Sequence, residues 1–161
     1  IVERYLKWAD NYQENQITLI YDTMWNSTRK MAEAIAEGIL EADPTVTVKL
    51  FNSATEDKND ILSEIFKSKA ILLGSAEING GYLHSIGGLI EMIKGLKFKG
   101  KSAAAFGSYG WSNKVVKLLT EELKECGFKV VNEGHSSNWV PDDNEIAILR
   151  EYGKDFVKAI Q

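Results

Sequence analysis

Short apolar runs alternate with helical patterns along the whole chain. The segments between the runs are too long for hairpin turns, and apolar residues recur in them at helical spacing. Strands that alternate with helices build right-handed βαβ units, which assemble into a parallel sheet covered by helices on both faces. The runs that we expect to be strands are residues 17–21, 46–51, 70–75, 102–108 and 129–131. The sequence therefore predicts one α/β domain with a five-stranded parallel sheet, and 161 residues suit such a domain.

The composition of two runs predicts their places in the sheet. Residues 70–75 (AILLGS) stay apolar up to the glycine, which is typical of a strand buried on both faces. Residues 46–51 (VTVKLF) alternate apolar and polar side chains, which indicates an edge strand with one face partly in water. Asp142 stands three residues before Glu145 and resembles a capping pair at the start of the last helix. The helices that we expect cover residues 28–40, 61–66, 86–94, 114–126 and 142–160.

The first residues have a pattern of their own. Ile1, Tyr5, Trp8 and Tyr12 fall on one stripe of a helix, which predicts a short amphipathic helix ahead of the sheet. We therefore divide the chain into a linker helix and linker, residues 1–16, and a domain formed by residues 17–161.

Composition and charge exclude several classes of function. The net charge is −4 and no basic stripe is present, so we do not expect the protein to bind nucleic acid. No apolar run is long enough to span a bilayer, so we do not expect a membrane protein. Cys126 has no partner for an internal disulfide, and His84 and His135 are too far apart in sequence to suggest a metal site. A reducing, cytoplasmic location is the simplest expectation.

Three loops follow strands at the edge of the sheet where ligands bind. In an open parallel sheet, ligands sit beyond the carboxyl ends of the strands, where the strand order reverses. The loops are residues 22–28 (DTMWNST), 75–82 (SAEINGGY) and 107–113 (GSYGWSN). General acid–base or nucleophilic catalysis would need a histidine, a cysteine or paired carboxylates, and none of these loops has such a set. We therefore expect no catalytic residue here, and loops that hold a ligand.

The first loop has the features of an anion site. It leads into the helix expected from Thr28, whose first N–H groups lack partners and carry partial positive charge. The hydroxyls of Thr23, Ser27 and Thr28 can donate to the same anion. The loop has neither the GxxxxGK[ST] pattern of nucleotide triphosphate sites nor the GxGxxG pattern of dinucleotide folds. An ordinary polar turn that caps a helix is the alternative.

The other two loops suit a flat aromatic ligand. Tyr109 and Trp111 stand in the third loop and Trp25 in the first, where loops usually carry polar residues. In the middle loop, Asn79–Gly81 can adopt positive φ and turn peptide groups toward the edge of a heterocycle. The alternatives are aromatic residues that merely cover the sheet and an ordinary Asn-Gly turn. A phosphate at one end and stacked rings at the other together describe flavin mononucleotide (FMN).

These motifs resemble those of a known family. The first loop matches the signature of the flavodoxins from Tyr21 to Ala32, except that Asn26 stands where the family usually has glycine or another small residue. Asparagine tolerates the left-handed backbone that such a position needs. More narrowly, YDTMWNSTRKMAEAI and FGSYGWS, with YLKWADNYQEN upstream, resemble the C-terminal flavodoxin-like domain of flavodiiron proteins.

The resemblance implies a fold and a set of cofactor-binding residues. The fold is a three-layer, doubly wound, flavodoxin-like α/β sheet with strand order 2-1-3-4-5, and the cofactor is FMN. In this chain the first two loops supply Thr23, Met24, Trp25, Asn26, Ser27, Thr28, Ser75, Ala76, Glu77, Ile78, Asn79, Gly80 and Gly81. The third loop supplies Ser108, Tyr109, Gly110, Trp111 and Ser112. Glu77 replaces a threonine common in the family, and we expect its charge to disfavour the anionic reduced flavin.

The resemblance also implies a role and partners. In flavodiiron proteins the flavin receives electrons from a rubredoxin-like protein or a flavin reductase. It passes them to a lactamase-like diiron domain, which reduces oxygen or nitric oxide, and subunits pair head to tail as homodimers. This chain has no diiron ligand motif, so we expect an electron-transfer domain of an oxidoreductase that does not reduce these gases efficiently alone.

Two other functions use a similar fold. An FMN-dependent NAD(P)H:quinone reductase would need the same cofactor loops. A signalling receiver would need a phosphorylated aspartate after the third strand, and Gly74 and Ser75 stand there, while Asp22 alone follows the first strand.

Overall fold

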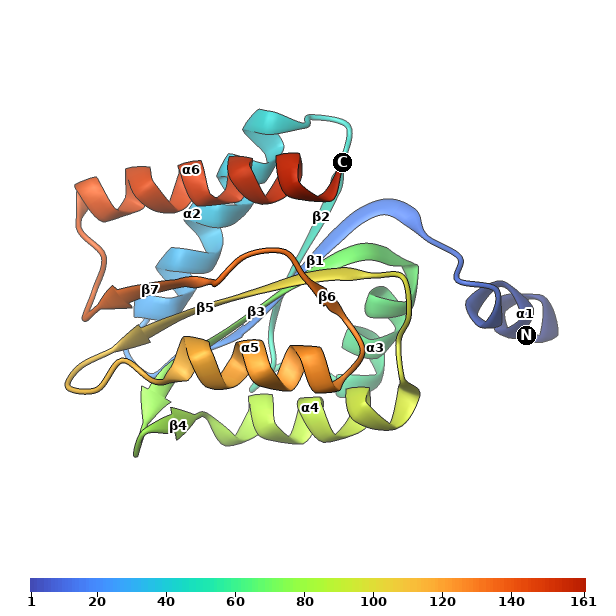
Figure 1. The fold of residues 1–161 in the computed structure, drawn as a ribbon, viewed down its shortest axis with the longest axis horizontal. Helices are drawn as coiled ribbons and strands as arrows, with labels where there is room; N and C mark the ends of the chain where they lie inside the picture. Colours follow the sequence, from blue (N-terminus) through green and yellow to red (C-terminus); the bar gives the residue numbers. More distant parts are fainter.

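A seven-stranded sheet lies between two layers of helices (Figure 1). The computed structural model describes residues 1–161, apart from the side chain of Trp8. The strands are β1 (Glu14–Asp22), β2 (Thr47–Asn52), β3 (Ser68–Ile78), β4 (Gly81–Tyr82), β5 (Ser102–Tyr109), β6 (Lys129–Val130) and β7 (His135–Asn138). The helices are α1 (Val2–Ala9), α2 (Ser27–Ala42), α3 (Lys58–Lys67), α4 (His84–Leu96), α5 (Val115–Glu125) and α6 (Asp143–Ile160).

The order of the main strands confirms the predicted topology. Neighbouring strands run β2-β1-β3-β5-β6, and these pairs are all parallel. Counting only the five predicted strands, this is the expected order 2-1-3-4-5. Helices α2 and α6 cover one face of the sheet, and α3, α4 and α5 cover the other.

The sheet contains two strands that the sequence does not predict. Strand β4 forms a hairpin with the end of β3, and β7 pairs in parallel with the second half of β5. Strand β6 pairs with the first half of β5 and β7 with the second half, so the predicted strand 129–131 corresponds to β6 alone. A turn that contains Gly134 separates β6 from β7. Strands β4 and β7 are held by backbone pairing with β3 and β5. Neither contains an apolar run, so the sequence pattern does not reveal them.

Burial along the strands follows the predicted pattern. The side chains of Ile71, Leu72 and Leu73 in β3 are fully buried, as expected for a strand covered on both faces. Strand β2 is at the edge of the sheet and partly exposed, also as expected. The side chain of Asp142 accepts a hydrogen bond of 2.9 Å from the N–H of Glu145, so the predicted cap of the last helix is confirmed.

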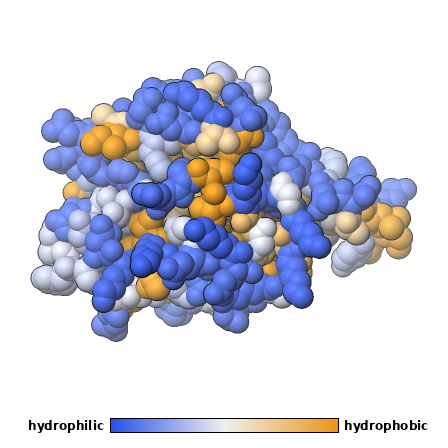
Figure 2. Space-filling view, viewed as in Figure 1, coloured by the Kyte–Doolittle hydropathy of each residue, from blue (hydrophilic) through white to orange (hydrophobic). Residues whose placement is uncertain are grey.

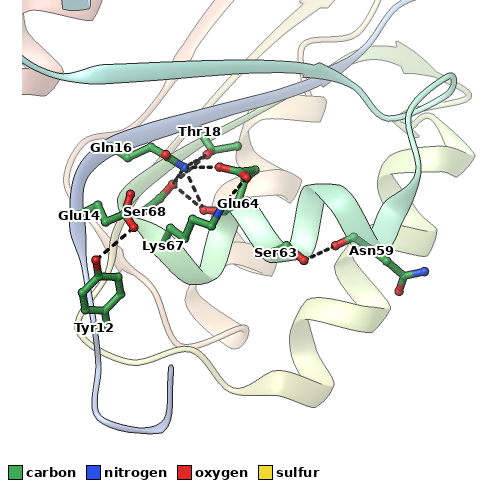
Figure 3. Close-up of polar contacts among 9 residues, drawn as sticks. All are labelled: Tyr12, Glu14, Gln16, Thr18, Asn59, Ser63, Glu64, Lys67 and Ser68. Atoms are coloured by element: carbon green, nitrogen blue, oxygen red, sulfur yellow. Dashed lines mark hydrogen bonds and ion pairs between the residues drawn. The ribbon is translucent and has the colours of Figure 1, made fainter. Parts of the chain in front are cut away.

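A buried polar network closes the end of the sheet opposite the three loops (Figure 3). The Gln16 amide donates to Oε2 of Glu64 at 2.9 Å and to the hydroxyl of Ser68 at 3.1 Å. The hydroxyls of Thr18 and Ser68 lie 2.8 Å apart. Burial raises the pKa of Glu64, but hydrogen bonds from Lys67 and Gln16 outweigh that effect and leave the pKa below its usual value. The network ties α3 to β1 and β3.

Helix α1 projects from the sheet on the side away from the three loops (Figure 1). Its apolar residues Val2, Tyr5 and Leu6, and Ile1 just before it, are each more than 60% exposed. Apolar atoms are visible on this projection in Figure 2. The side chain of Trp8, which we placed on the same stripe, lies outside the described residues. Of the helices described, none is long and apolar enough to cross a membrane.

Helices α2 and α6 approach closely at two glycines. A Cβ atom on Gly38 would lie 1.9 Å from the carbonyl oxygen of Arg150, and one on Gly153 would lie 2.3 Å from that of Ile35. Neither distance is possible without moving backbone. This contact fixes α2, whose first turn borders the predicted ligand site.

We predict that Gly153→Ala lowers the free energy of unfolding by about 1–3 kcal/mol, since the new methyl group forces the two helices apart. Gly95, in α4, is the matched control because a Cβ atom there meets nothing within 4 Å. Gly95→Ala should raise stability by about 1 kcal/mol, the helix propensity difference. Urea unfolding of both variants measures this, and equal stability of Gly153→Ala and the wild type would refute the packing argument.

Candidate functional site

The three predicted loops border one cleft at the carboxyl edge of the sheet. The cleft has a volume of about 470 Å³. Its lining contains thirteen of the eighteen predicted site residues and one that was not predicted, Trp139. The lining residues are Met24, Trp25, Ser27, Ala76, Glu77, Ile78, Asn79, Gly80, Ser108, Tyr109, Gly110, Trp111, Ser112 and Trp139.

The other five predicted residues do not line the cleft; they are Thr23, Asn26, Thr28, Ser75 and Gly81. Thr28 and Ser75 are fully buried behind the loops. The Ser75 hydroxyl accepts a hydrogen bond from the N–H of Leu83 at 2.9 Å and donates to the carbonyl of Ala76 at 2.8 Å. It therefore holds the two ends of the middle loop together.

The first loop presents the bare end of a helix. Asn26 has φ 62° and ψ 4°, the left-handed conformation expected for this position. Its side chain does not cap α2, and the first turn of α2 has no acidic residue. The partial positive charge at the start of this 16-residue helix is therefore not neutralised from within the helix.

Hydroxyl groups surround this helix end. Those of Ser27 and Thr28 each lie 2.9 Å from the hydroxyl of Ser108, which joins the first loop to the third. The hydroxyl oxygen of Thr23 is buried and has no hydrogen-bond partner among the described residues. Buried polar atoms are rarely left without a partner in proteins, so this hydroxyl is available to a ligand.

Asp22 shapes the first loop from beneath. Its carboxylate is buried and accepts hydrogen bonds from the N–H of Thr23 at 2.7 Å and from the hydroxyl of Ser85 at 2.5 Å. The Ser85 hydroxyl also lies 2.6 Å from that of Ser53, the residue after β2. Asp22 therefore connects β1, β2 and α4. Sequence reasoning gave it no part in the site, because its partners are distant in sequence.

The middle loop is a tight hairpin turn. Asn79 and Gly80 have φ of 51° and 73°, so both adopt the positive φ that the sequence suggests. Gly81 is not in that region and instead begins β4. Two consecutive residues with positive φ between paired strands form the turn that best fits strand twist. Both residues of the turn line the cleft.

Glu77 ties the middle loop to the third loop. Its carboxylate accepts hydrogen bonds from the hydroxyl of Ser112, from the N–H of Lys114 at 2.7 Å and from that of Val115 at 3.1 Å. Burial raises the pKa of Glu77, but these bonds and the charge of Lys114 outweigh burial and leave the pKa below its usual value. Glu77 thus caps α5, and the positive end of that helix offsets part of its charge.

Aromatic rings surround the mouth of the cleft. Trp25 and Trp111 are 83% and 92% exposed, and Tyr109 is half-buried. Trp139 follows β7, and its ring centroid is 5.1 Å from that of Trp111 with the planes at 78°. Sequence reasoning missed Trp139 because β7 was not predicted. The only available signal was a tryptophan two residues before Pro141 and the last helix.

The chemistry of the lining suits binding better than bond-making. Glu77 is the only charged residue among those that line the cleft. His84 is exposed at the start of α4, and His135 pairs with Glu145 at 2.6 Å outside the cleft. Among the described side chains, no three or more His, Cys, Asp or Glu residues gather as they would around a metal ion.

Comparisons with known proteins agree with this geometry. The sequence model of the family described as "Flavodoxin" matches residues 19–151. The anaerobic nitric oxide reductase flavorubredoxin of Escherichia coli is 47% identical over 158 residues, which are 98% of this chain and 33% of that protein. The rubredoxin oxygen:oxidoreductase of Desulfovibrio gigas has a TM-score of 0.91 and 33% identity, over 99% of this chain and 39% of that one. The flavodiiron protein of Giardia intestinalis has a TM-score of 0.90 at 24% identity, with the same coverage of both chains.

These comparisons confirm the predicted resemblance to the flavodoxin-like part of flavodiiron proteins. They also confirm the flavodoxin-like fold and FMN as the cofactor of such domains. The chain spans about a third of the length of the curated relatives that it matches.

We predict that Glu77→Gln lowers the free energy of unfolding of the cofactor-free protein by about 1 kcal/mol at pH 7, as loss of a helix cap does. The pKa of Glu77 is lowered by folding, so its contribution is present above the unfolded pKa and is lost as the pH falls through the folded pKa. The difference between variant and wild type should therefore shrink from pH 7 toward about pH 3.

Urea unfolding at several pH values tests the cap, with Glu121→Gln on the exposed face of α5 as the control. Hydrogen exchange of the Lys114 and Val115 amides should speed up in Glu77→Gln alone. Unchanged exchange at these two amides would contradict the assigned hydrogen bonds.

Proposed function

This chain belongs to the flavodoxin family, and on that premise we propose that it is an FMN-binding electron-transfer domain that serves a diiron domain. It would receive electrons from a reduced donor and pass them to a lactamase-like diiron domain, in the same polypeptide or in a partner subunit. The observation that carries the proposal is the cleft itself, which is lined by hydroxyls and aromatic rings and borders the bare end of α2.

The phosphate of FMN fits the first loop. The uncapped start of α2 provides N–H groups and partial positive charge, and the unpartnered hydroxyl of Thr23 provides a further donor. Ser27 and Ser108 border the same region of the cleft. This arrangement supports a phosphate held without a lysine.

The ring system of FMN fits the aromatic side of the cleft. Trp25, Tyr109 and Trp111 offer flat surfaces, and the turn at Asn79–Gly80 offers peptide groups to the ring edge. When bound, the flavin supplies the electron-transfer chemistry, and these residues orient it and limit its contact with water. Loops without catalytic groups suit a protein that holds the flavin and leaves the electron transfer to it. We propose the eighteen predicted residues as the cofactor-binding set. Of those that do not line the cleft, Thr23 donates to the phosphate, and Thr28 and Ser75 support the loops from behind.

The identities of the donor and acceptor are inferred from the relatives. Their names include a flavorubredoxin, a rubredoxin oxygen:oxidoreductase and a flavodiiron protein. We infer a rubredoxin-like protein or a flavin reductase as donor, a reducing cytoplasmic location, and residues 1–16 as the linker to the diiron domain. Pairing of two copies, with each flavin facing the partner's diiron domain, belongs to the same proposal.

The direct test is a titration of the cofactor-free protein with FMN, followed by absorption and by quenching of flavin fluorescence. Stoichiometric binding and a yellow complex support the proposal, and absence of binding at saturating FMN overturns it. The purified complex should reduce a diiron partner when a donor is supplied. Rapid steady-state turnover with NAD(P)H and a quinone, without a reductase, would instead favour a quinone reductase.

We predict that Thr23→Val raises the Kd for FMN about tenfold, because a hydrogen bond to a charged phosphate is lost. The Kd for riboflavin, which lacks the phosphate, should not change. The cofactor-free variant should be at least as stable as the wild type, since the deleted hydroxyl has no protein partner. Equal weakening for both ligands would show that Thr23 acts on the ring end or on folding.

We predict that Trp111→Ala raises the Kd for both FMN and riboflavin, by about tenfold, because stacking surface is lost. Stability of the cofactor-free protein should barely change, as this side chain is almost fully exposed. Fluorescence titration with each ligand is the measurement. An unaltered affinity would remove Trp111 from the site.

A further inference from the structure

Trp139 combines a strained backbone with a place at the mouth of the cleft. It lines the cleft, and 55% of the residue is exposed, so much of its surface is not covered by the rest of the protein. Its φ is 57°, in the left-handed region that a bulky side chain rarely adopts. Such strain persists only where the surroundings hold it, and it gathers at functional sites.

The surroundings that hold Trp139 belong to the third loop. Its N–H donates to the carbonyl of Tyr109 at 2.8 Å, and the side chain of Asn138 donates to the carbonyl of Gly110 at 3.1 Å. The ring of Trp139 lies over Gly110, where a Cβ atom would be 3.2–3.5 Å from three of its atoms. The strained residue is therefore anchored to the segment that carries Trp111.

The ring of Trp139 supports that of Trp111. The two indoles meet edge to face at 5.1 Å, a favourable geometry for aromatic pairs. Trp111 is 92% exposed, so little else in the described part of the protein restricts its ring. Without Trp139, the Trp111 side chain would be free to change rotamer, and a ligand would have to order it on binding.

We propose that Trp139 is a positioning residue, which holds the ring of Trp111 in place for the flavin and thereby preorganises the aromatic side of the site. The inference rests on the proposed function. The left-handed backbone at Trp139 places its indole in edge-to-face contact with that of Trp111. The hydrogen bonds to the third loop offset the strain of this backbone conformation.

The test uses Trp139→Gly, which removes the ring and relieves the strain, and Trp139→Phe, which keeps a ring. Lys97→Gly is the matched control, because Lys97 also has a positive φ, of 49°, and lies at the end of α4, outside the cleft. Trp139→Gly should raise the Kd for FMN about fivefold, without a lower melting temperature of the cofactor-free protein. Trp139→Phe should restore most of the affinity, and Lys97→Gly should not change it.

A double-mutant cycle with Trp111→Ala decides whether Trp139 acts through Trp111. If it does, Trp139→Gly has no further effect on the Kd for FMN once Trp111 is an alanine. Near-ultraviolet circular dichroism of the cofactor-free protein should also lose the signal of the coupled indoles in Trp139→Gly and not in Lys97→Gly.

Three results would overturn the inference. One is an unchanged Kd in Trp139→Gly while the wild type binds FMN, and another is an equal loss of affinity in the presence and absence of Trp111. The third is a fall in melting temperature that accounts for the weaker binding, which would make Trp139 a purely structural residue. Failure of the wild type to bind FMN is a separate result that overturns the proposed function together with the inference.

Discussion

The parallel pairing of β1, β3 and β5 determines where the rest of the site can be. In the register of these strands, Asp22 lies beside Ser75, and Ser75 lies beside Gly107. Three loops therefore leave the sheet from one line, although more than 80 residues separate the first from the last. The apolar runs bury the strands on both faces and so fix this register, because a shift by one residue would turn core side chains outward.

Helix packing then positions the start of α2 and the partial positive charge that it carries. Helix α2 begins at the first loop, and its contact with α6 at Gly38 and Gly153 leaves no room to slide. The same contact is flanked by ion pairs, Arg150 with Glu37 at 2.6 Å and Lys154 with Glu41 at 2.9 Å. The end of α2 that borders the cleft is thus held by residues far from it.

The loops are joined to one another by side chains. Ser108 connects the third loop to the first, and Glu77 connects the middle loop to the start of α5. Trp139, which follows β7, contacts the third loop through its backbone and its ring. A site built in this way is largely formed before its ligand arrives, which reduces the ordering cost of binding.

The sequence by itself determined the alternation of strands and helices, the edge of the sheet that carries the cleft and most of the residues that line it, while the strand order was implied only by the resemblance to flavodoxins. Apolar runs, helical spacing and loop composition are local signals, so they can be read without knowing what lies beside them. Tertiary structure alone decided the pairing of β4 and β7, the buried contacts of Asp22, the cap formed by Glu77 and the place of Trp139. Those features depend on backbone pairing and on contacts between distant segments. No pattern within a single segment encodes them.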